Sequence, residues 1–343
     1  MPSSHSSGSA DRPLVVTMGE PAGIGAEITI KAWRARNEAE GVPPFLFLGD
    51  AGLLQERAEL AGLEALFALV ETPRQAMDAF SDALPVMNLA LARPSRPGDL
   101  DPANAKAVIG AIDQACALAL AGEVAGIVTN PIHKRALYDA GFSAPGHTEY
   151  LAALTGAHQP VMMLSCPGLR VVPVTVHLPL ARVAGALTTE AIIGQGRILA
   201  HGLIHDFGIA VPRIAVAALN PHAGEEGKLG TEESTIITPA IRQLQAEGIR
   251  IDGPWPADTL FHAEARARYD AVLCMYHDQA LIPLKTIDFE HGVNTTLGLP
   301  IVRTSPDHGT ALDIAAKGIA HPGSLIAALR EAALIARHRS ARP

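Results

Sequence analysis

The 343-residue chain is poor in several features that mark common protein classes. Its three cysteines, Cys116, Cys166 and Cys274, form no CxxC pair, which argues against a disulfide framework and favours a reduced, cytoplasmic protein. A net charge of −8 argues against a general surface for nucleic acid or anionic membranes. No apolar run reaches the roughly 18 residues that a membrane-spanning helix needs.

Aromatic residues make up only 4% and charged residues 18% of the chain, whereas 48% of its residues are hydrophobic. This composition is typical of a globular protein with a large core. The N-terminal stretch MPSSHSSGSADR is rich in Ser and Gly and has no hydrophobic segment, so it is not a signal peptide. We expect residues 1–12 to form a disordered leader.

Apolar runs alternate with helical patterns along the remaining chain. The stretches PLVVTMG, PFLFLGD and VAGIVTN read as buried strands, and DPANAKAVIGAIDQACALALAG as a helix capped by Asp101. This alternation predicts an α/β fold with a largely parallel sheet. The stretch TMGEPAGIGAE matches neither the dinucleotide nor the phosphate-binding glycine pattern, and we interpret it as a tight strand-to-helix turn.

Three further apolar runs lead to a histidine at or just beyond their C-terminal end. They lead to His177, His222 and His277. Because ligands bind at the carboxyl edge of a parallel sheet, these imidazoles can converge on one divalent metal. Asp258 or Asp278 could orient a ligand through its second ring nitrogen. The alternative is three unrelated loop or capping histidines.

Other polar residues fit an anionic ligand. His147 and Thr148 lie at an expected helix start, where backbone amides favour anions. Lys285, Asn294 and Arg303 are interleaved with apolar segments, which suits phosphate or carboxylate binding. The alternatives are a plain N-cap at Thr148 and a solvated loop for the other three. Lys134 follows the end of an expected strand. It could be a catalytic or anion-binding lysine, or equally a solvated lysine of a helix.

These patterns occur together in one known family. The motifs MGEPAGIG, GHTEY, VHLPL, LNPHAGE, ADTLF, YHDQALIPLK and GVNTTLGLPIVRTSPDHGTALDIA resemble those of the 4-hydroxythreonine-4-phosphate dehydrogenases of vitamin B6 biosynthesis, from about Val15 to about Ser324. The resemblance implies two α/β/α domains with a cleft between them, like those of isocitrate and isopropylmalate dehydrogenases. We expect a first domain of residues 13–135 plus 305–343, and a second of residues 136–304 that carries the metal histidines.

The resemblance also assigns site residues. The family's metal ligands match the three strand-tip histidines, and its substrate-binding positions match the following residues: His147, Thr148, Lys285, Asn294 and Arg303. The stretch DHGTALDIAAKGIAHP is similar to the adenosine-binding HGSAPDIAGKGIANP of the isocitrate and isopropylmalate enzymes, which makes His308, Gly309, Thr310 and Asp313 candidates for cofactor binding. Leu312 and His321 depart from that pattern.

The activity implied is an NAD- or NADP-dependent oxidation of 4-phosphohydroxy-L-threonine, with one divalent metal (Zn, Mg or Co) per site. The product, 2-amino-3-oxo-4-(phosphooxy)butanoate, decarboxylates to 3-amino-2-oxopropyl phosphate. Asp258, Lys134 or His147 would relay the proton. The family is a homodimer whose active site takes residues from both subunits.

Two alternatives remain at this stage. The first is a related dehydrogenase acting on erythronate or threonate 4-phosphate, or on a cis-dihydrodiol carboxylate. The second is a metal-dependent hydrolase or a non-catalytic metal-binding protein, which the histidine set alone allows. The adenosine-like stretch argues against the second.

Overall fold

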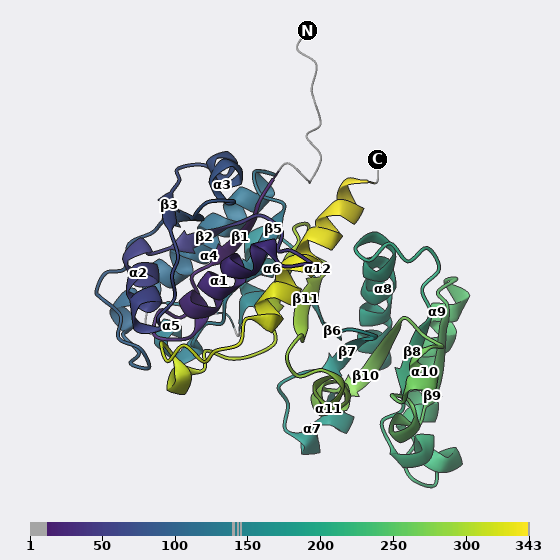
Figure 1. The fold of residues 1–343 in the computed structure, drawn as a ribbon. Helices are drawn as coiled ribbons and strands as arrows, with labels where there is room; N and C mark the ends of the chain where they lie inside the picture. Colours follow the sequence, from purple (N-terminus) through teal and green to yellow (C-terminus); the bar gives the residue numbers. More distant parts are fainter. Residues whose placement is uncertain (1–11, 139–140, 143, 145, 342–343) are drawn as a thin grey trace. The chain divides into compact units, whose positions relative to one another are not determined.

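The computed structural model describes residues 12–138, 141–142, 144 and 146–341 (Figure 1). Of the expected leader, only Arg12 falls among them; residues 1–11 lie outside the described part. The chain forms two compact units, residues 1–160 with 299–343 (unit 1) and residues 161–298 (unit 2). No described helix is both long and apolar enough to cross a membrane.

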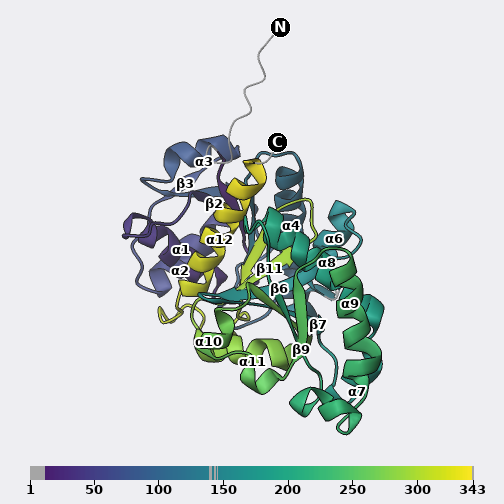
Figure 2. The ribbon, with the colours of Figure 1, turned by 90° about the vertical axis from the view of Figure 1, so that its right-hand side faces the viewer.

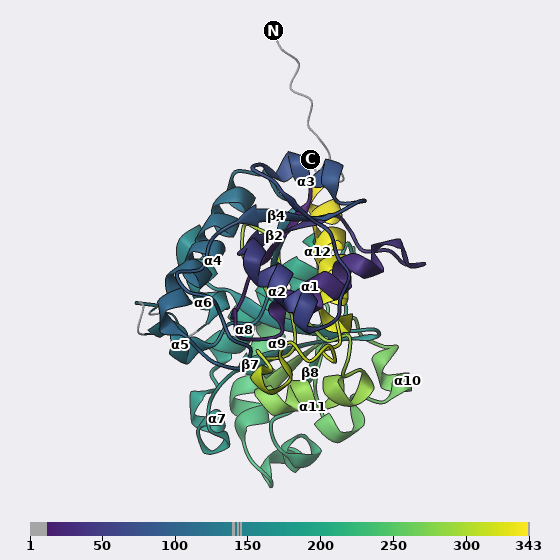
Figure 3. The ribbon, with the colours of Figure 1, turned by 60° about the vertical axis from the view of Figure 1, so that its left-hand side comes forward.

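Unit 1 is built on a parallel sheet with the strand order β3-β4-β2-β1-β5-β12. The strands are β1 (Leu14–Thr17), β2 (Phe45–Gly49), β3 (Phe67–Leu69), β4 (Leu84–Asn88), β5 (Gly126–Thr129) and β12 (Arg303–Pro306). The helices are α1 (Gly25–Arg34), α2 (Ala51–Leu60), α3 (Pro73–Ala79), α4 (Ala105–Leu120), α5 (Lys134–Tyr138), α6 (His147–Thr155) and α12 (Gly323–Ser340). Helices α4 to α6 lie on one side, and α1, α2 and α12 on the other (Figure 3).

The local sequence accounts for these elements. Every residue of β1, β2 and β5 is buried, as expected for strands covered on both faces. Helix α2 is capped by Asp50, whose side chain accepts a hydrogen bond from the Leu53 backbone N at 2.7 Å. The expected cap Asp101 accepts from Ala103 N at 2.9 Å, but it caps a short 3₁₀ turn that precedes α4.

Unit 2 has the strand order β11-β6-β7-β10-β8-β9. Its strands are β6 (Val161–Cys166), β7 (Leu169–Thr175), β8 (Ile214–Ala217), β9 (Ile251–Trp255), β10 (Ala271–Tyr276) and β11 (Val293–Leu297). Its helices are α7 (Leu180–Ala186), α8 (Thr189–His205), α9 (Thr238–Ala246), α10 (Ala263–Arg266) and α11 (His277–Ile287). Helices α8 and α9 cover one side of the sheet, and α10 and α11 the other (Figure 2).

The α/β fold class is therefore confirmed, with one addition. The pairs β11–β6 and β6–β7 are antiparallel, whereas β7, β10, β8 and β9 pair in parallel. A tight turn at Pro167 and Gly168 joins β6 to β7, and Gly168 has φ +80°. This left-handed conformation suits glycine and lets the chain reverse at once.

The units end at other residues than the expected domains. Residues 136–160 pack with unit 1, because α5 and α6 contact α4 and because Leu151 and Ala152 join its hydrophobic core. Leu299 and Ile301 belong to the same core. His147, Thr148 and Arg303, which we had expected in the histidine-bearing domain, therefore lie in unit 1.

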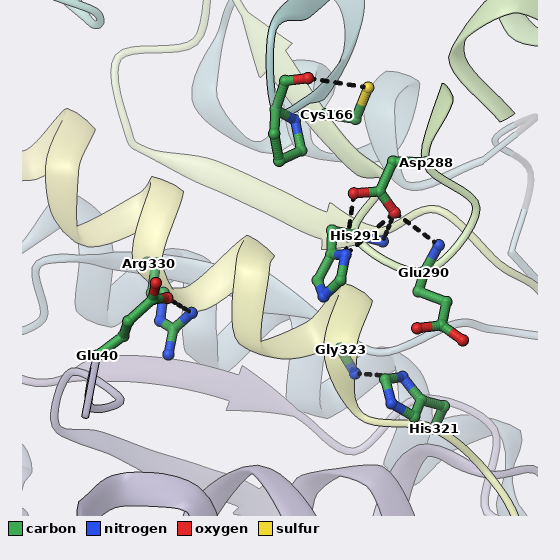
Figure 4. A network of polar contacts seen from close by, with 9 residues as sticks. Glu40, Cys166, Asp288, Glu290, His291, His321, Gly323 and Arg330 are labelled. Carbon is green, nitrogen blue, oxygen red and sulfur yellow. Dashed lines mark hydrogen bonds and ion pairs between the residues drawn. The ribbon is translucent and has the colours of Figure 1, made fainter. Parts of the chain in front are cut away.

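All three cysteines are buried. Burial raises the pKa of Cys166 to about 11, and raises the pKa values of Cys116 and Cys274 as well. The Cys166 Sγ lies 3.9 Å from the Pro167 carbonyl oxygen (Figure 4). The thiols are thus core residues, as the sequence suggested for Cys116 and Cys274.

Candidate active site

The three histidines of unit 2 follow adjacent parallel strands, β7, β10 and β8. Tyr276, the last residue of β10, is opposite Thr175, the last residue of β7. His277 and His177 follow within two residues, and His222 follows β8 in the turn Pro221–Gly227. All three therefore follow the carboxyl ends of neighbouring parallel strands, at the edge of the unit 2 sheet where parallel sheets bind ligands.

Two of these histidines lie close together. The ring centres of His177 and His277 are 5.8 Å apart, and two imidazoles sharing a tetrahedral metal have ring centres roughly 5 Å apart. The His277 Nδ1 lies 2.7 Å from Asp278 Oδ1. This contact suits a tautomer whose Nε2 faces the ligand. The pair therefore fits a divalent metal in donor type and spacing.

The third histidine lies on a left-handed turn. His222, Ala223, Glu225 and Glu226 all have positive φ, between 44° and 56°, and each such L-residue costs about 1–2 kcal/mol. Among the residues that the structure describes, no three His, Cys, Asp or Glu side chains are arranged to hold a metal ion. One chain thus presents a histidine pair and a separate third histidine.

Two depressions border the histidine pair. One, of about 320 Å³, is lined by both His177 and His277; the other, of about 380 Å³, is lined by Asp258. Tyr276, Asp278 and Ile282 line both depressions. Asp258 is exposed on a short turn. Asp258 thus lines the neighbouring depression and not the one that His277 lines.

Lys285 and Asn294 also lie in unit 2, on α11 and β11. The Lys285 Nζ lies 5.1 Å from the centre of the Phe289 ring, and the buried Asn294 Oδ1 has no hydrogen-bond partner within the described chain. Asp288 accepts hydrogen bonds from the Glu290 and His291 backbone, and its carboxylate also contacts the His291 ring (Figure 4). These hydrogen bonds hold the turn that connects α11 to β11.

Unit 1 holds a buried cation at the start of β12. Arg303 is 4% exposed, and its Nη2 donates a hydrogen bond to Thr129 Oγ1 at 2.7 Å. Burial lowers the pKa of Arg303 to about 10, against an opposing effect of Glu149. The guanidinium is still charged at neutral pH.

His147 lies next to this cation. Its pKa is held well below the usual value by burial and by the charges of Arg303 and Lys134, so the ring is neutral at pH 7. Its buried Nε2 has no hydrogen-bond partner among the described residues. His147 is the first residue of α6, and Thr148 the second. The N-cap is Gly146, without a side-chain cap, so the plain-cap interpretation of Thr148 was wrong. This cluster suits an anion.

The expected cofactor residues His308, Gly309, Thr310 and Asp313 follow β12 in unit 1. Of these, Thr310 contacts the glycine-rich turn after β1, which the sequence analysis did not assign to a site. Ile24 N donates a hydrogen bond to the Thr310 carbonyl at 3.1 Å. Two backbones can approach this closely only where one of them has a glycine. Gly23 was therefore the sequence signal for this contact.

A second buried arginine, Arg57 on α2, was missed entirely. It is 0% exposed, and its Nη2 donates to the carbonyl oxygens of Pro21 (3.2 Å) and Ser95 (3.1 Å). Glu20, the residue before Pro21, is 5% exposed, and burial raises its pKa. The spacing could have revealed it, because Arg57 follows Leu53 and Leu54 by four and three residues and so lies on the apolar face of α2.

Replacing Gly23 by alanine should disturb the contact with Thr310. An added Cβ would lie 2.7 Å from the Thr310 carbonyl oxygen, and we expect a loss of about 1–3 kcal/mol of unfolding free energy. Gly110→Ala in α4 is the matched control, since its Cβ would meet only Leu89 at 3.6 Å; it should be neutral or stabilising by up to about 1 kcal/mol. Urea unfolding measures both, and equal midpoints for the two variants would contradict the close approach.

A model of the family "Pyridoxal phosphate biosynthetic protein PdxA" matches residues 41–332. The chain belongs to this family. It is 56% identical over 334 residues to the 4-hydroxythreonine-4-phosphate dehydrogenase of Caulobacter vibrioides, covering 96% of this chain and 98% of that one. The resemblance to the 4-hydroxythreonine-4-phosphate dehydrogenases that the motifs indicated is therefore confirmed.

Solved structures of PdxA relatives agree. The Klebsiella pneumoniae 4-hydroxythreonine-4-phosphate dehydrogenase superposes with a TM-score of 0.85 at 38% identity, covering 95% of this chain and 98% of that one. A terephthalate 1,2-cis-dihydrodiol dehydrogenase from Burkholderia xenovorans LB400 gives a TM-score of 0.63 at 27% identity, covering 94% and 98%. The dihydrodiol alternative is thus the more distant relative of the two.

Proposed function

We propose that this PdxA-family chain oxidises 4-phosphohydroxy-L-threonine with NAD or NADP. The cofactor would accept a hydride from the carbinol carbon, and a base of the protein would take up the hydroxyl proton. The resulting 2-amino-3-oxo-4-(phosphooxy)butanoate loses carbon dioxide to give 3-amino-2-oxopropyl phosphate. The observation that carries this proposal is the anion cluster of unit 1, a buried Arg303 beside a neutral His147 in a chain 56% identical to a 4-hydroxythreonine-4-phosphate dehydrogenase.

The anion cluster would bind the substrate phosphate or carboxylate. Arg303 offers a fixed, planar donor set, and Lys134 adds a mobile charge. A neutral His147 that carries its proton on Nε2 can donate one hydrogen bond from this nitrogen to an anionic oxygen. Thr148 would add its hydroxyl and the amides of the α6 start. In unit 2, Lys285 and Asn294 would bind further polar groups of the substrate.

We propose His177, His222 and His277 as ligands of a divalent cation. Three imidazoles favour zinc or cobalt over magnesium, which prefers oxygen ligands. When bound, such a cation would act as a Lewis acid on the substrate hydroxyl and on the carbonyl formed from it. Asp278 would hold the His277 ring in orientation, and Asp258 would take up the hydroxyl proton.

We further propose a cytoplasmic homodimer whose sites take residues from both subunits. The described part of one chain brings His177 and His277 together but arranges no third ligand with them. In this proposal His222 would join the pair when a cation binds, and the partner subunit would line the rest of the site. His308, Gly309, Thr310 and Asp313 would hold the adenosine half of the cofactor, beside the turn of Gly23.

The test is NAD(P)H formation at 340 nm. The substrates are 4-phosphohydroxy-L-threonine, D-erythronate 4-phosphate, D-threonate 4-phosphate and a cis-dihydrodiol carboxylate, each with and without a chelator. We expect chelator-sensitive turnover of the first alone. Turnover of only another substrate would replace the proposed activity by that of a related dehydrogenase, and turnover that is insensitive to the chelator would remove the metal from the proposal.

A further inference from the structure

The turn that carries His222 is held by a buried carboxylate from the segment that leads into α9. Glu233 is 6% exposed. Its Oε1 accepts hydrogen bonds from the backbone N of Leu219 (2.9 Å) and of Asn220 (2.7 Å), and its Oε2 accepts from Asn220 Nδ2 at 3.0 Å. Glu232 accepts from the same Nδ2 at 2.8 Å. Both oxygens of Glu233 are therefore used to hold the start of the turn.

The contact between this carboxylate and the turn is close. The turn is left-handed from His222 to Glu226, with Gly224 at φ +78°. A Cβ at Gly224 would lie 2.7 Å from Glu233 Oε2. Because histidine, alanine and glutamate seldom adopt this conformation, external contacts must impose it. Glu233 supplies such contacts at the entry of the turn and beside its middle.

The strand before the turn is anchored separately. Gln279, 7% exposed, donates from Nε2 to the Ala218 carbonyl at 2.6 Å and accepts from Met275 N at 2.7 Å. The end of β8 is thereby tied to β10, the strand that leads to His277. Glu233 binds the backbone of the next two residues, Leu219 and Asn220. It therefore fixes the path of the chain from Ala218 toward His222.

We propose that Glu233 is a positioning residue for His222 as a metal ligand. The carboxylate fixes the entry and the left-handed course of the turn, and so presents the imidazole in one orientation to a divalent cation. The inference depends on the proposed metal function and names the residue that sets its affinity. A purely structural role, as the start of the segment Glu233–Ile237 before α9, predicts a change in stability without a change in affinity.

The experiment is equilibrium binding of Co²⁺ to the full-length protein, followed by absorption and by competition with a chelator. Glu233→Gln keeps the size of the side chain but puts an NH₂ donor opposite the donors of Asn220. We expect the dissociation constant for Co²⁺ to rise by about 10- to 100-fold. The matched control Glu264→Gln makes the same chemical change at an exposed acid of unit 2, and it should bind Co²⁺ like the wild type.

Thermal unfolding of the chelator-treated proteins separates affinity from stability. A wild-type dissociation constant in Glu233→Gln overturns the inference, whether or not its unfolding midpoint falls. If that variant does not fold, Asn220→Ala decides: it removes only the Nδ2 contacts, and we expect a severalfold rise in the dissociation constant, whereas an unchanged value overturns the inference.

The same titration distinguishes this inference from the proposed function. Co²⁺ binding that is lost in His222→Ala but unchanged in Glu233→Gln leaves the metal function standing and refutes the role of Glu233 alone. A wild-type protein that binds no Co²⁺ refutes both.

Discussion

Replacing His277 by alanine is expected to lower turnover of 4-phosphohydroxy-L-threonine by about a thousandfold, equivalent to about 4 kcal/mol of transition-state stabilisation. His277 is the first residue of α11, its ring centre is 5.8 Å from that of His177, and its Nδ1 is held by Asp278. Removing it breaks up the histidine pair, and Lewis-acid stabilisation of this kind contributes several kcal/mol. Steady-state rates and the zinc content after dialysis measure the effect.

The matched control is His262→Ala. His262 is an exposed histidine of unit 2 that precedes α10 and makes no side-chain cap there. It should retain the rate and the zinc content of the wild type. A His277→Ala variant that kept both would exclude the strand-tip histidines from the metal function.

The second large effect is expected at Arg303. Replacing it by methionine should lower kcat/KM by about 100- to 1000-fold, or about 3–4 kcal/mol, because a buried cation that pairs with an anion contributes 2–5 kcal/mol. The same change should leave the unfolding free energy equal or higher. Burial of this guanidinium is costly, as its lowered pKa indicates, and apolar replacement of buried charges is often stabilising by about 1–4 kcal/mol.

Kinetics with the phosphorylated substrate and urea unfolding without it measure the two halves of this prediction. Arg330→Met serves as the control, since Arg330 pairs with the exposed Glu40 at 2.6 Å (Figure 4). It should change neither kcat/KM nor stability by more than about 1 kcal/mol. A normal kcat/KM in Arg303→Met would move the anion site elsewhere, and a large loss of stability would show that the charge is structural.

The strand tips were predictable from the sequence because burial on both faces leaves continuous apolar runs. Val171, Ile214 and Ala271 lie in such runs, and the polar residue that ends each run marks the carboxyl edge. The helix start at His147 was also predictable, because Pro145 and Gly146 indicate a turn and the residues after Gly146 favour a helix. Motif resemblance then supplied the identities that periodicity alone cannot give.

Other features could not be predicted because they depend on partners distant in the sequence. Apolar content does not reveal strand direction, so the antiparallel pairing of β6 with β7 and β11 was missed. His222, Ala223, Glu225 and Glu226 do not favour the left-handed backbone that they adopt, and Glu233, which holds the entry of this turn, is distant from it in the sequence. Arg57 lies on the buried face of α2 with Leu53 and Leu54, and the carbonyl oxygens that it binds, of Pro21 and Ser95, are distant in the sequence.

The buried thiols make this protein a convenient scaffold for site-specific chemistry. With a pKa of about 11 for Cys166, only about one such thiol in ten thousand is ionised at pH 7, and alkylating reagents attack the thiolate. A cysteine introduced at an exposed position, such as Leu66 in unit 1 or Val211 in unit 2 (69% and 66% exposed), would react first. Paired fluorescent labels at these positions can therefore be attached without removing any native cysteine, and energy transfer between them would follow the distance between the units during turnover.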